Sequence, residues 1–373
     1  MRHRLRLIAA ILSAALPVNF AHAADSPLTA NQPAVEEGQI QGAQFTVLRP
    51  ARWNRHVLLI AHGYVPEGRP LQVDLSLETP AYRTLVNEGW LVGKTSYRRN
   101  GIIVTDAIAD VNALLELIVK KYGKPDRVIL EGESMGGLIV TLLAERAPQD
   151  YQGAVAIGAA LQIDEPGAKV RPSGQPKIPL IFMSNQTELD GPLAYSTQPS
   201  STQNPALAPA VFRISRDGHV NVNQAERLVA LRALNAWIDS GRGTLPVPTA
   251  GATTHDATVI PRPTASRVVV APDRRGFKAH VTAIARAYGN VFVDAQTLDF
   301  ETAGIAPQTW FDLVAHGQSF RAFYGSGFDS VKEGEWVVFP DADGFTCVCR
   351  NFADAAGSAR LSLGDEVTVR PSK

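Results

Sequence analysis

Short apolar runs alternate with longer amphipathic segments between about residues 44 and 240. Each short run is almost continuously apolar, which is typical of a strand that is covered on both faces in a parallel sheet. We predict a strand for each run: HVLLIA (56–61), GWLVGKT (89–95), RVILEG (127–132), GAVAIG (153–158), IPLIFMS (178–184) and, more weakly, VFRIS (211–215).

The segments between these strands have the spacing of amphipathic helices. In residues 105–123, apolar side chains recur at helical spacing from Ile108 to Tyr122. Residues 135–148 and 221–241 have the same character. This alternation of strands and helices predicts an α/β fold with a doubly wound, mostly parallel sheet.

The pattern changes at about residue 241. Residues 241–262 are rich in Gly, Pro, Thr and Ala without periodicity, as in a linker. Beyond them, turns containing Gly and Asp separate short β-like runs such as NVFVDA, EWVVFP and DEVTVR. We therefore predict a first domain over 24–240 and a second, mainly β domain over 263–373.

Composition narrows the class of protein. The chain has 373 residues, of which 45% are apolar and 19% charged, which fits a globular protein with a substantial core. The formal net charge is zero, so nothing favours nucleic acid or an anionic membrane as a partner. The cysteines are Cys347 and Cys349, and their C-x-C spacing leads us to expect two reduced thiols. No metal or cofactor is implied.

The N-terminus has the pattern of a secretory signal peptide over residues 1–23. Basic residues precede an apolar run over 7–16, and Ala21-His22-Ala23 suits cleavage before Ala24. The apolar run is too short to span a membrane, and no later stretch reaches the ~18 unbroken apolar residues that a span requires. We expect an exported protein, periplasmic or secreted.

Candidate chemistry is concentrated in Gly132-Glu133-Ser134-Met135-Gly136, a G-x-S-x-G pattern. The pattern lies directly between a predicted strand and a predicted helix, which is the context of a nucleophile elbow. In such a turn the flanking glycines avoid a clash with neighbouring backbone, and the helix N-terminus favours developing negative charge. Ser134 is therefore the candidate nucleophile.

Two further motifs support this interpretation: His62-Gly63-Tyr64 after the first strand, and a histidine, His219, after the last one. Together with the elbow, they resemble the α/β-hydrolase family over about residues 44–240. The resemblance implies that His219 is the general base and that the backbone N–H groups of Met135 and Tyr64 form the oxyanion hole. The order nucleophile, acid, histidine also follows from it.

The acid that orients the histidine should follow the IPLIFMS strand, where the sequence reads NQTELDGP. Glu188 and Asp190 both qualify. Glu188 is favoured because it stands where the family commonly has the Asp of G-x-x-D, and Asp164 is a more remote alternative. These residues predict an exported serine hydrolase that cleaves a carboxylic ester through an acyl-enzyme. Peptidase or amidase activity on the same triad is the alternative, and a catalytically idle binding protein is a third possibility.

The second domain has a resemblance of its own. The Tyr288–Val291 segment, Asn351 with Ala355, and the closing LGDEVTV (363–369) are similar to the C-terminal β domain of the S-adenosylmethionine hydroxide adenosyltransferase family. The resemblance implies adenine contacts at Arg350 and Asn351, and hence a nucleoside-type ligand as one alternative. The catalytic domain of that family has no counterpart here, so we expect a domain used for packing, dimerisation or substrate presentation. Together with the loop 191–210, it is also a candidate cover for the cleft.

Overall fold

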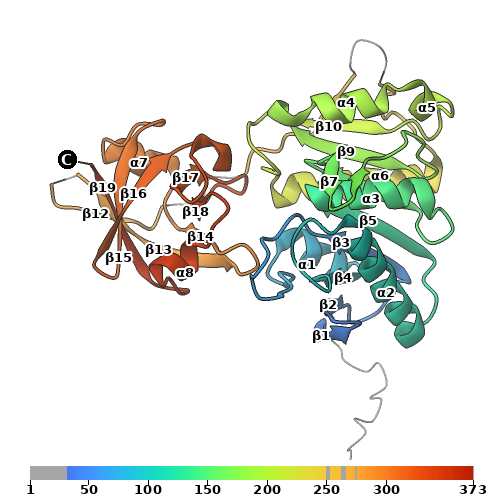
Figure 1. The fold of residues 1–373 in the computed structure, drawn as a ribbon, viewed down its shortest axis with the longest axis horizontal. Helices are drawn as coiled ribbons and strands as arrows, with labels where there is room; N and C mark the ends of the chain where they lie inside the picture. Colours follow the sequence, from blue (N-terminus) through green and yellow to red (C-terminus); the bar gives the residue numbers. More distant parts are fainter. Residues whose placement is uncertain (1–31, 249–252, 262–265, 274, 373) are drawn as a thin grey trace, which may run out of the picture.

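The computed structural model describes residues 32–248, 253–261, 266–273 and 275–372, which form two domains side by side (Figure 1). The predicted signal peptide, residues 1–23, lies outside the described residues. No helix in the described part of the chain is long and apolar enough to cross a bilayer.

The first domain is built on a mostly parallel sheet. Within the described residues its strand order is β1-β2-β4-β3-β5-β6-β9-β10-β11, antiparallel at β1–β2 and β2–β4 and parallel elsewhere. The strands are β1 (Ala34–Ile40), β2 (Ala43–Arg49), β3 (His56–Ala61), β4 (Leu91–Thr95), β5 (Arg127–Glu133), β6 (Gly153–Ile157), β9 (Leu180–Asn185), β10 (Ala210–Ile214) and β11 (His255–Asp256). The six strands predicted from the apolar runs are all present.

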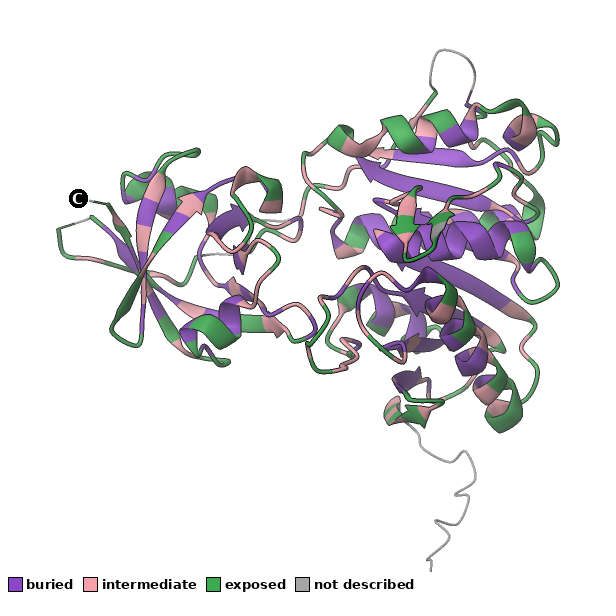
Figure 2. Cartoon of the chain, in the orientation of Figure 1, coloured by how far each residue is buried: buried purple, intermediate pink, exposed green. Residues whose placement is uncertain are grey.

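Helices cover both faces of this sheet. The helices α2 (Val104–Tyr122) and α3 (Met135–Arg146) pack into one core, and α1 (Pro80–Asn87) and α6 (Gln224–Ser240) into the other. Figure 2 shows the central strands buried between them. Because both faces are covered, the strands need no polar alternation, and this explains the continuous apolar runs of the sequence. The expected doubly wound, mostly parallel sheet is confirmed.

Several smaller elements were not predicted. The β1–β2 hairpin precedes the first predicted strand, and β11 lies inside segment 241–262, which we interpreted as a linker. That segment thus includes an edge strand, and Ala257 beside it is buried in the α6-side core. The remaining short elements are β7 (Ile163–Glu165), β8 (Ala168–Val170), the 3-10 turn η1 (Gln186–Glu188), α4 (Asp190–Ser196) and α5 (Pro199–Thr202).

The second domain is a β-barrel, as its mainly β pattern predicted. Its strand order is β12-β13-β14-β18-β17-β16-β15-β19, and pairing of β13 with β19 closes the barrel. The strands are β12 (Val269–Val270), β13 (Phe277–Ala285), β14 (Asn290–Val293), β15 (Trp310–Ala315), β16 (Gln318–Tyr324), β17 (Trp336–Pro340), β18 (Thr346–Arg350) and β19 (Glu366–Pro371). The helices α7 (Thr297–Thr302) and α8 (Ala355–Ala359), with the 3-10 turn η2 (Phe328–Ser330), lie between strands.

The expectation of two reduced thiols is wrong. Cys347 and Cys349 on β18 form a disulfide, with a Cα–Cα distance of 5.9 Å. This separation is shorter than the extended-strand spacing that we assumed, and it falls within the ordinary range for disulfides.

A buried ion-pair network joins β5 to the helix face behind it. Arg227 on α6 forms ion pairs with Glu131 and with Glu133, the latter at 2.5 Å, and Tyr82 donates a hydrogen bond to Glu131 at 2.9 Å. The side chains of Arg227 and Glu131 are almost fully buried. A buried carboxylate is tolerated only when its charge is paired, so Arg227 compensates for placing acids on both sides of Gly132.

Arg227→Met should therefore lower the free energy of unfolding of the first domain by about 3–5 kcal/mol, because Glu131 would be left buried without its cation. Urea denaturation followed by tryptophan fluorescence measures this. Arg232→Met is the matched control, since Arg232 lies on the same helix and pairs with Glu88 at the surface at 2.8 Å. Its loss should cost no more than about 1 kcal/mol. Equal effects of the two variants would contradict the interpretation.

Candidate active site

The strand-to-helix turn at Ser134 has the geometry of a nucleophile elbow. Ser134 has φ 54° and ψ −115°, a backbone conformation that residues other than glycine rarely adopt. A Cβ on Gly132 would lie 2.1 Å from the Gly136 carbonyl oxygen, and one on Gly136 would lie 2.0 Å from that of Ala61. Any side chain at either position would push the turn apart, so the two predicted glycine requirements are steric.

The sheet places this turn beside the other candidate residues. Gly132 pairs with Ala61 of β3 on one side and with Ala156 of β6 on the other. The carboxyl ends of parallel strands lie at one edge of the sheet, and ligand sites are commonly built at that edge. The loop after β3, which carries His62-Gly63-Tyr64, therefore starts next to the elbow.

Three of the predicted residues form one hydrogen-bonded chain. Nε2 of His219 lies 2.8 Å from Oγ of Ser134, and Nδ1 of His219 contacts Oε1 of Glu188. The Val220 N–H donates to the other carboxylate oxygen of Glu188 at 3.3 Å. With its Nδ1 proton donated to Glu188, the histidine has Nε2 free to accept the serine proton.

The structure also distinguishes the candidate acids by their contact with His219. Glu188 closes the 3-10 turn after β9 and points to His219. Asp190 is exposed at the first position of α4, and Asp164 is exposed on β7. In the described part of the chain neither of these aspartates forms a hydrogen bond or ion pair with His219.

The electrostatic surroundings raise the pKa of His219. Burial lowers the pKa of its imidazole, but the hydrogen bond and charge of Glu188, together with the charges of Glu133 and Asp329, outweigh burial and raise the pKa above its ordinary value. The charge of Glu133 persists because Arg227 and Lys94 overcome the effect of burial and lower the pKa of that carboxyl. Asp329 belongs to the barrel, so the second domain contributes to this field.

The predicted oxyanion donors lie next to Ser134. The N–H groups of Met135 and Tyr64 donate no hydrogen bond within the described residues, so both are available to a ligand. His62 holds the loop that carries Tyr64: its Nδ1–H donates to the Gly63 carbonyl at 2.7 Å, and its ring stacks on Tyr97. Burial, aided by Lys94, lowers the pKa of His62 to about 4, so this histidine is neutral.

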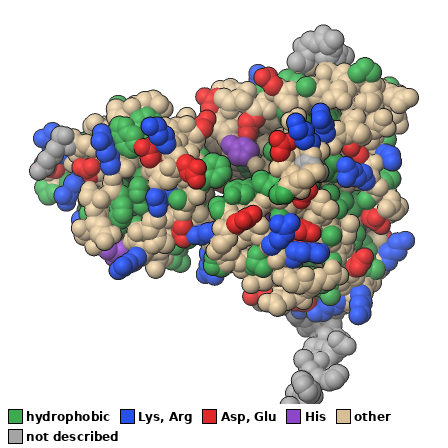
Figure 3. All heavy atoms as spheres, viewed as in Figure 1, with side chains coloured by type: hydrophobic (Ala, Val, Ile, Leu, Met, Phe, Trp, Pro, Cys, Tyr) green, Lys and Arg blue, Asp and Glu red, His purple; other side chains and the backbone are tan. Residues whose placement is uncertain are grey.

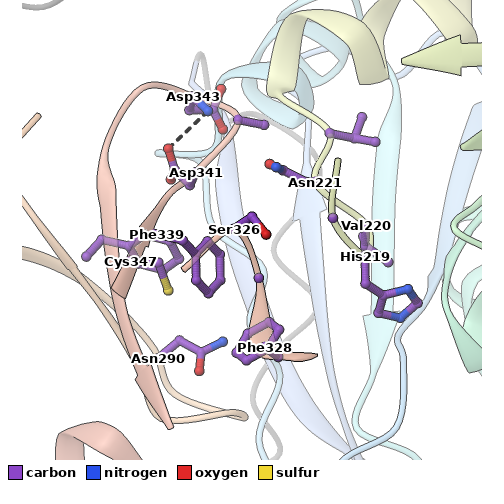
Figure 4. Close-up of a pocket in the computed structure, with 15 residues that line it drawn as sticks. His219, Val220, Asn221, Asn290, Ser326, Phe328, Phe339, Asp341, Asp343 and Cys347 are labelled. Carbon is purple, nitrogen blue, oxygen red and sulfur yellow. Dashed lines mark hydrogen bonds between the residues drawn. The ribbon is translucent and has the colours of Figure 1, made fainter. Parts of the chain in front are cut away.

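A cavity of about 210 Å³ adjoins the site between the two domains (Figure 4). Residues 218–222 of the His219 loop form one wall, and barrel residues including Phe328, Phe339 and Asp341 form the other. In Figure 4 the His219 ring is turned away from the barrel side chains. Figure 3 shows both acidic and basic side chains along the junction of the domains, whereas no Lys or Arg is among the described residues lining the cavity.

The residues that the barrel resemblance assigned to adenine have partners within the barrel. Arg350 donates to the Gly334 carbonyl at 3.0 and 2.6 Å and lies over the ring of Trp336, while Asn351 donates to the Val331 carbonyl at 2.9 Å. A nucleoside-type ligand therefore stays a prediction of the sequence. Among the described residues, no group of three or more His, Cys, Asp or Glu is placed to hold a metal ion.

The sequence did not identify the barrel residues at the site. Tyr288, in the turn between β13 and β14, has its hydroxyl 3.8 Å from the point where a Cβ of Gly63 would lie. In the sequence, Tyr288 is only the first residue of the Tyr288–Val291 segment, and no pattern singles out Asp329. No local pattern could place either residue beside Ser134, because their proximity depends on how the two domains dock.

Comparison with known proteins gives one family match. The profile of the family described as serine aminopeptidase, S33, matches residues 93–203, which include the elbow and Glu188 but neither His219 nor the barrel. No curated protein matches the chain significantly.

Solved structures match parts of the chain at low sequence identity. An esterase from Pyrococcus furiosus has 14% identity over 56% of this chain and 91% of that chain, with a TM-score of 0.40. An acylaminoacyl peptidase from Pyrococcus horikoshii has 10% identity over 50% of this chain and 37% of that chain, with a TM-score of 0.38. An uncharacterized conserved protein from Thermotoga maritima has 22% identity over 37% of this chain and 49% of its own length, with a TM-score of 0.26. The match thus spans about half of the Thermotoga protein.

The pKa of His219 gives a direct test of the acid. In wild type the imidazole should lose its proton at a pH above the ordinary histidine pKa of about 6.5. The neutral form should therefore become the major form only as the pH rises past this raised pKa. Glu188→Gln should lower the pKa, because the opposing effect of burial remains. Histidine-selective NMR titration measures the shift, with His219→Gln assigning the signal. Asp190→Asn should leave the pKa unchanged, and a drop in that variant instead would identify Asp190 as the acid.

Proposed function

We propose that this protein is a serine hydrolase that cleaves carboxylic esters through a Ser134–His219–Glu188 triad. The observation that carries the proposal is the continuous chain of hydrogen-bonding contacts from the Ser134 hydroxyl to the Glu188 carboxylate. A serine hydroxyl is a weak nucleophile unless a positioned base removes its proton, and the base needs an acid to fix its orientation. The match to a hydrolase family over residues 93–203 supports the same class.

The reaction follows from these positions. As the Ser134 oxygen bonds to the substrate carbonyl carbon, its proton passes to Nε2 of His219, and Glu188 stabilises the imidazolium that forms. The carbonyl oxygen becomes an oxyanion held by the N–H groups of Met135 and Tyr64. His219 then gives its proton to the departing alcohol, which leaves an acyl group on Ser134. Water, deprotonated by the same histidine, then bonds to the acyl carbon. The bond from that carbon to the Ser134 oxygen breaks, the carboxylic acid leaves, and His219 returns its proton to the serine oxygen.

The cavity beside the His219 loop favours an uncharged or cationic part of a substrate. Its aromatic residues Phe292, Phe328 and Phe339 provide apolar surface, and Asp341 and Asp343 are its acidic residues. Burial raises the pKa of Asp341 to about 6, so above that pH its carboxylate would repel an anionic group. A small ester of modest polarity fits this lining.

Peptidase activity is the second candidate, because the matching family profile is described as serine aminopeptidase. The same triad can cleave an amide when the leaving amine is well positioned.

We further propose export, on the signal-like pattern of residues 1–23. The Cys347–Cys349 disulfide agrees with a compartment outside the reducing cytosol. The proposed mechanism uses no metal or cofactor.

A fluorophosphonate probe tests for the activated serine. Wild-type protein, without residues 1–23, should be labelled covalently, whereas Ser134→Ala should not. Hydrolysis of short 4-nitrophenyl esters by Ser134→Ala and by His219→Ala should fall by about 10⁴-fold or more, the scale seen when a triad member is removed. Circular dichroism confirms that each variant is folded. A folded wild type that takes up no probe would refute the hydrolase assignment.

Matched ester and amide substrates distinguish esterase from peptidase activity. A 4-nitrophenyl ester and a 4-nitroanilide with the same acyl group differ only in the leaving atom. We expect a much larger kcat/KM for the ester, because 4-nitrophenolate is a better leaving group than 4-nitroaniline, which must gain a proton as it departs. Comparable values for the two substrates would favour the peptidase.

A further inference from the structure

The barrel is attached to the segment that carries the oxyanion loop. Residues 62–79, all described, form neither helix nor strand. Arg69 of this segment forms an ion pair with Asp354 of the barrel and donates to the Arg286 carbonyl at 3.1 Å. Asp74 accepts a hydrogen bond from the Ala287 N–H at 2.9 Å. A segment without regular structure of its own is thus held at two points by the second domain.

The same barrel turn presents Tyr288 to the nucleophile. A point at the Cβ position of Gly63 lies 3.3 Å from Cβ of Ser134 and 3.8 Å from the Tyr288 hydroxyl. The nucleophile and the phenol therefore border one small space above Gly63. Glycine at position 63 keeps this space open.

Tyr288 is held there by close packing of the turn. A Cβ on Gly289 would lie 2.1 Å from Oδ1 of Asp354, so only glycine allows this approach. Asp354 in turn pairs with Arg69 of the oxyanion segment and accepts a hydrogen bond from the Gly357 N–H at 2.8 Å. The contacts run from Arg69 through Asp354 to the Tyr288 turn, and they fix the phenol relative to the first domain.

The phenol is neutral, and its proton is free for a ligand. Burial raises the pKa of Tyr288, and the negative charges of Glu133 and Asp74 add to the increase. A hydrogen bond from the Gly63 backbone N–H to the phenol oxygen lowers the pKa of Tyr288, but by less than burial raises it. No described residue accepts a hydrogen bond from the Tyr288 hydroxyl. Tyr288 is half-buried, so its hydroxyl remains a donor for a ligand or water.

We infer that the Tyr288 hydroxyl, supplied by the barrel, donates a hydrogen bond to the substrate carbonyl oxygen beside the N–H groups of Met135 and Tyr64. The inference rests on the proposed hydrolase function and adds a third donor to its oxyanion hole. As negative charge develops on the carbonyl oxygen, a preorganised neutral donor stabilises the transition state more than the ground state. The barrel thereby becomes part of the catalytic site.

Tyr288→Phe tests this by removing one oxygen and keeping the ring that packs at the interface. We expect kcat for a 4-nitrophenyl ester to fall by about 10²-fold with KM nearly unchanged, the effect of deleting one oxyanion donor. Affinity for a trifluoromethyl ketone, whose adduct with Ser134 carries an oxyanion, should fall by a similar factor. Tyr324→Phe makes the same chemical change in the barrel core, where Tyr324 stacks on Phe300, and should leave kcat unaltered.

Gly63→Ala provides a second test in the first domain. Its φ is not in the left-handed region, so alanine is compatible with the backbone, and its methyl group would occupy the space between Ser134 and Tyr288. We expect the folded variant to lose most esterase activity and trifluoromethyl ketone binding.

The outcomes separate the inference from the function on which it rests. If wild type is labelled by fluorophosphonate, and Tyr288→Phe retains both wild-type kcat and ketone affinity, the inference is overturned and the hydrolase stands. If kcat falls while ketone affinity is kept, Tyr288 acts only in packing, which also overturns it. An unlabelled, folded wild type overturns both proposals.

Discussion

The close approach of helix α3 to strand β3 is the constraint on which the site depends. Gly136 sits so near the Ala61 carbonyl that no side chain fits between them, and Gly132 meets Gly136 with equal closeness. This contact forces Ser134 into its unusual backbone conformation at the carboxyl end of a central strand. The strain is tolerable because buried strands and helices on both faces fix the turn from every side. With the serine so placed, the His62–Tyr64 loop reaches it from the adjacent strand β3, and the His219 loop reaches it from the end of β10, beyond β6 and β9.

Two sets of charged side chains surround the elbow, one within the fold at Arg227 and one at His219. Below it, Arg227 pairs with the carboxylates of Glu131 and Glu133, so β5 can carry acids on both sides of Gly132. Above it, Glu188 neutralises the charge that His219 gains when it takes up a proton. Glu133 belongs to both sets, because it pairs with Arg227 and its negative charge also raises the pKa of His219. A network that stabilises the fold thereby also tunes the candidate base.

The second domain does more than flank the first. It contributes most of the wall of the cavity beside His219, contacts the segment 62–79 through Arg69 and Asp74, and places Tyr288 next to Gly63. The turn at Tyr288 belongs to one of the three segments on which the predicted resemblance to the adenosyltransferase β domain rests. Here that turn faces the first domain, while Arg350 is bound to its own loops. The same motif thus serves docking between the domains in this structure.

The sequence by itself determined the strands of the parallel sheet, the three long helices and the elbow, because burial on both faces and helical periodicity are written in local apolar patterns. It also favoured Glu188 over Asp190, and the structure places Glu188 against His219. It did not determine the edge strand β11, the Cys347–Cys349 disulfide or the position of Tyr288. Only the tertiary structure decided these. The pairing of β11 and the position of Tyr288 depend on contacts between segments whose distance in space no local pattern encodes, namely a strand end meeting a sheet edge and one domain docking on another. The disulfide depends on a local shortening of β18 that the extended-strand spacing does not show.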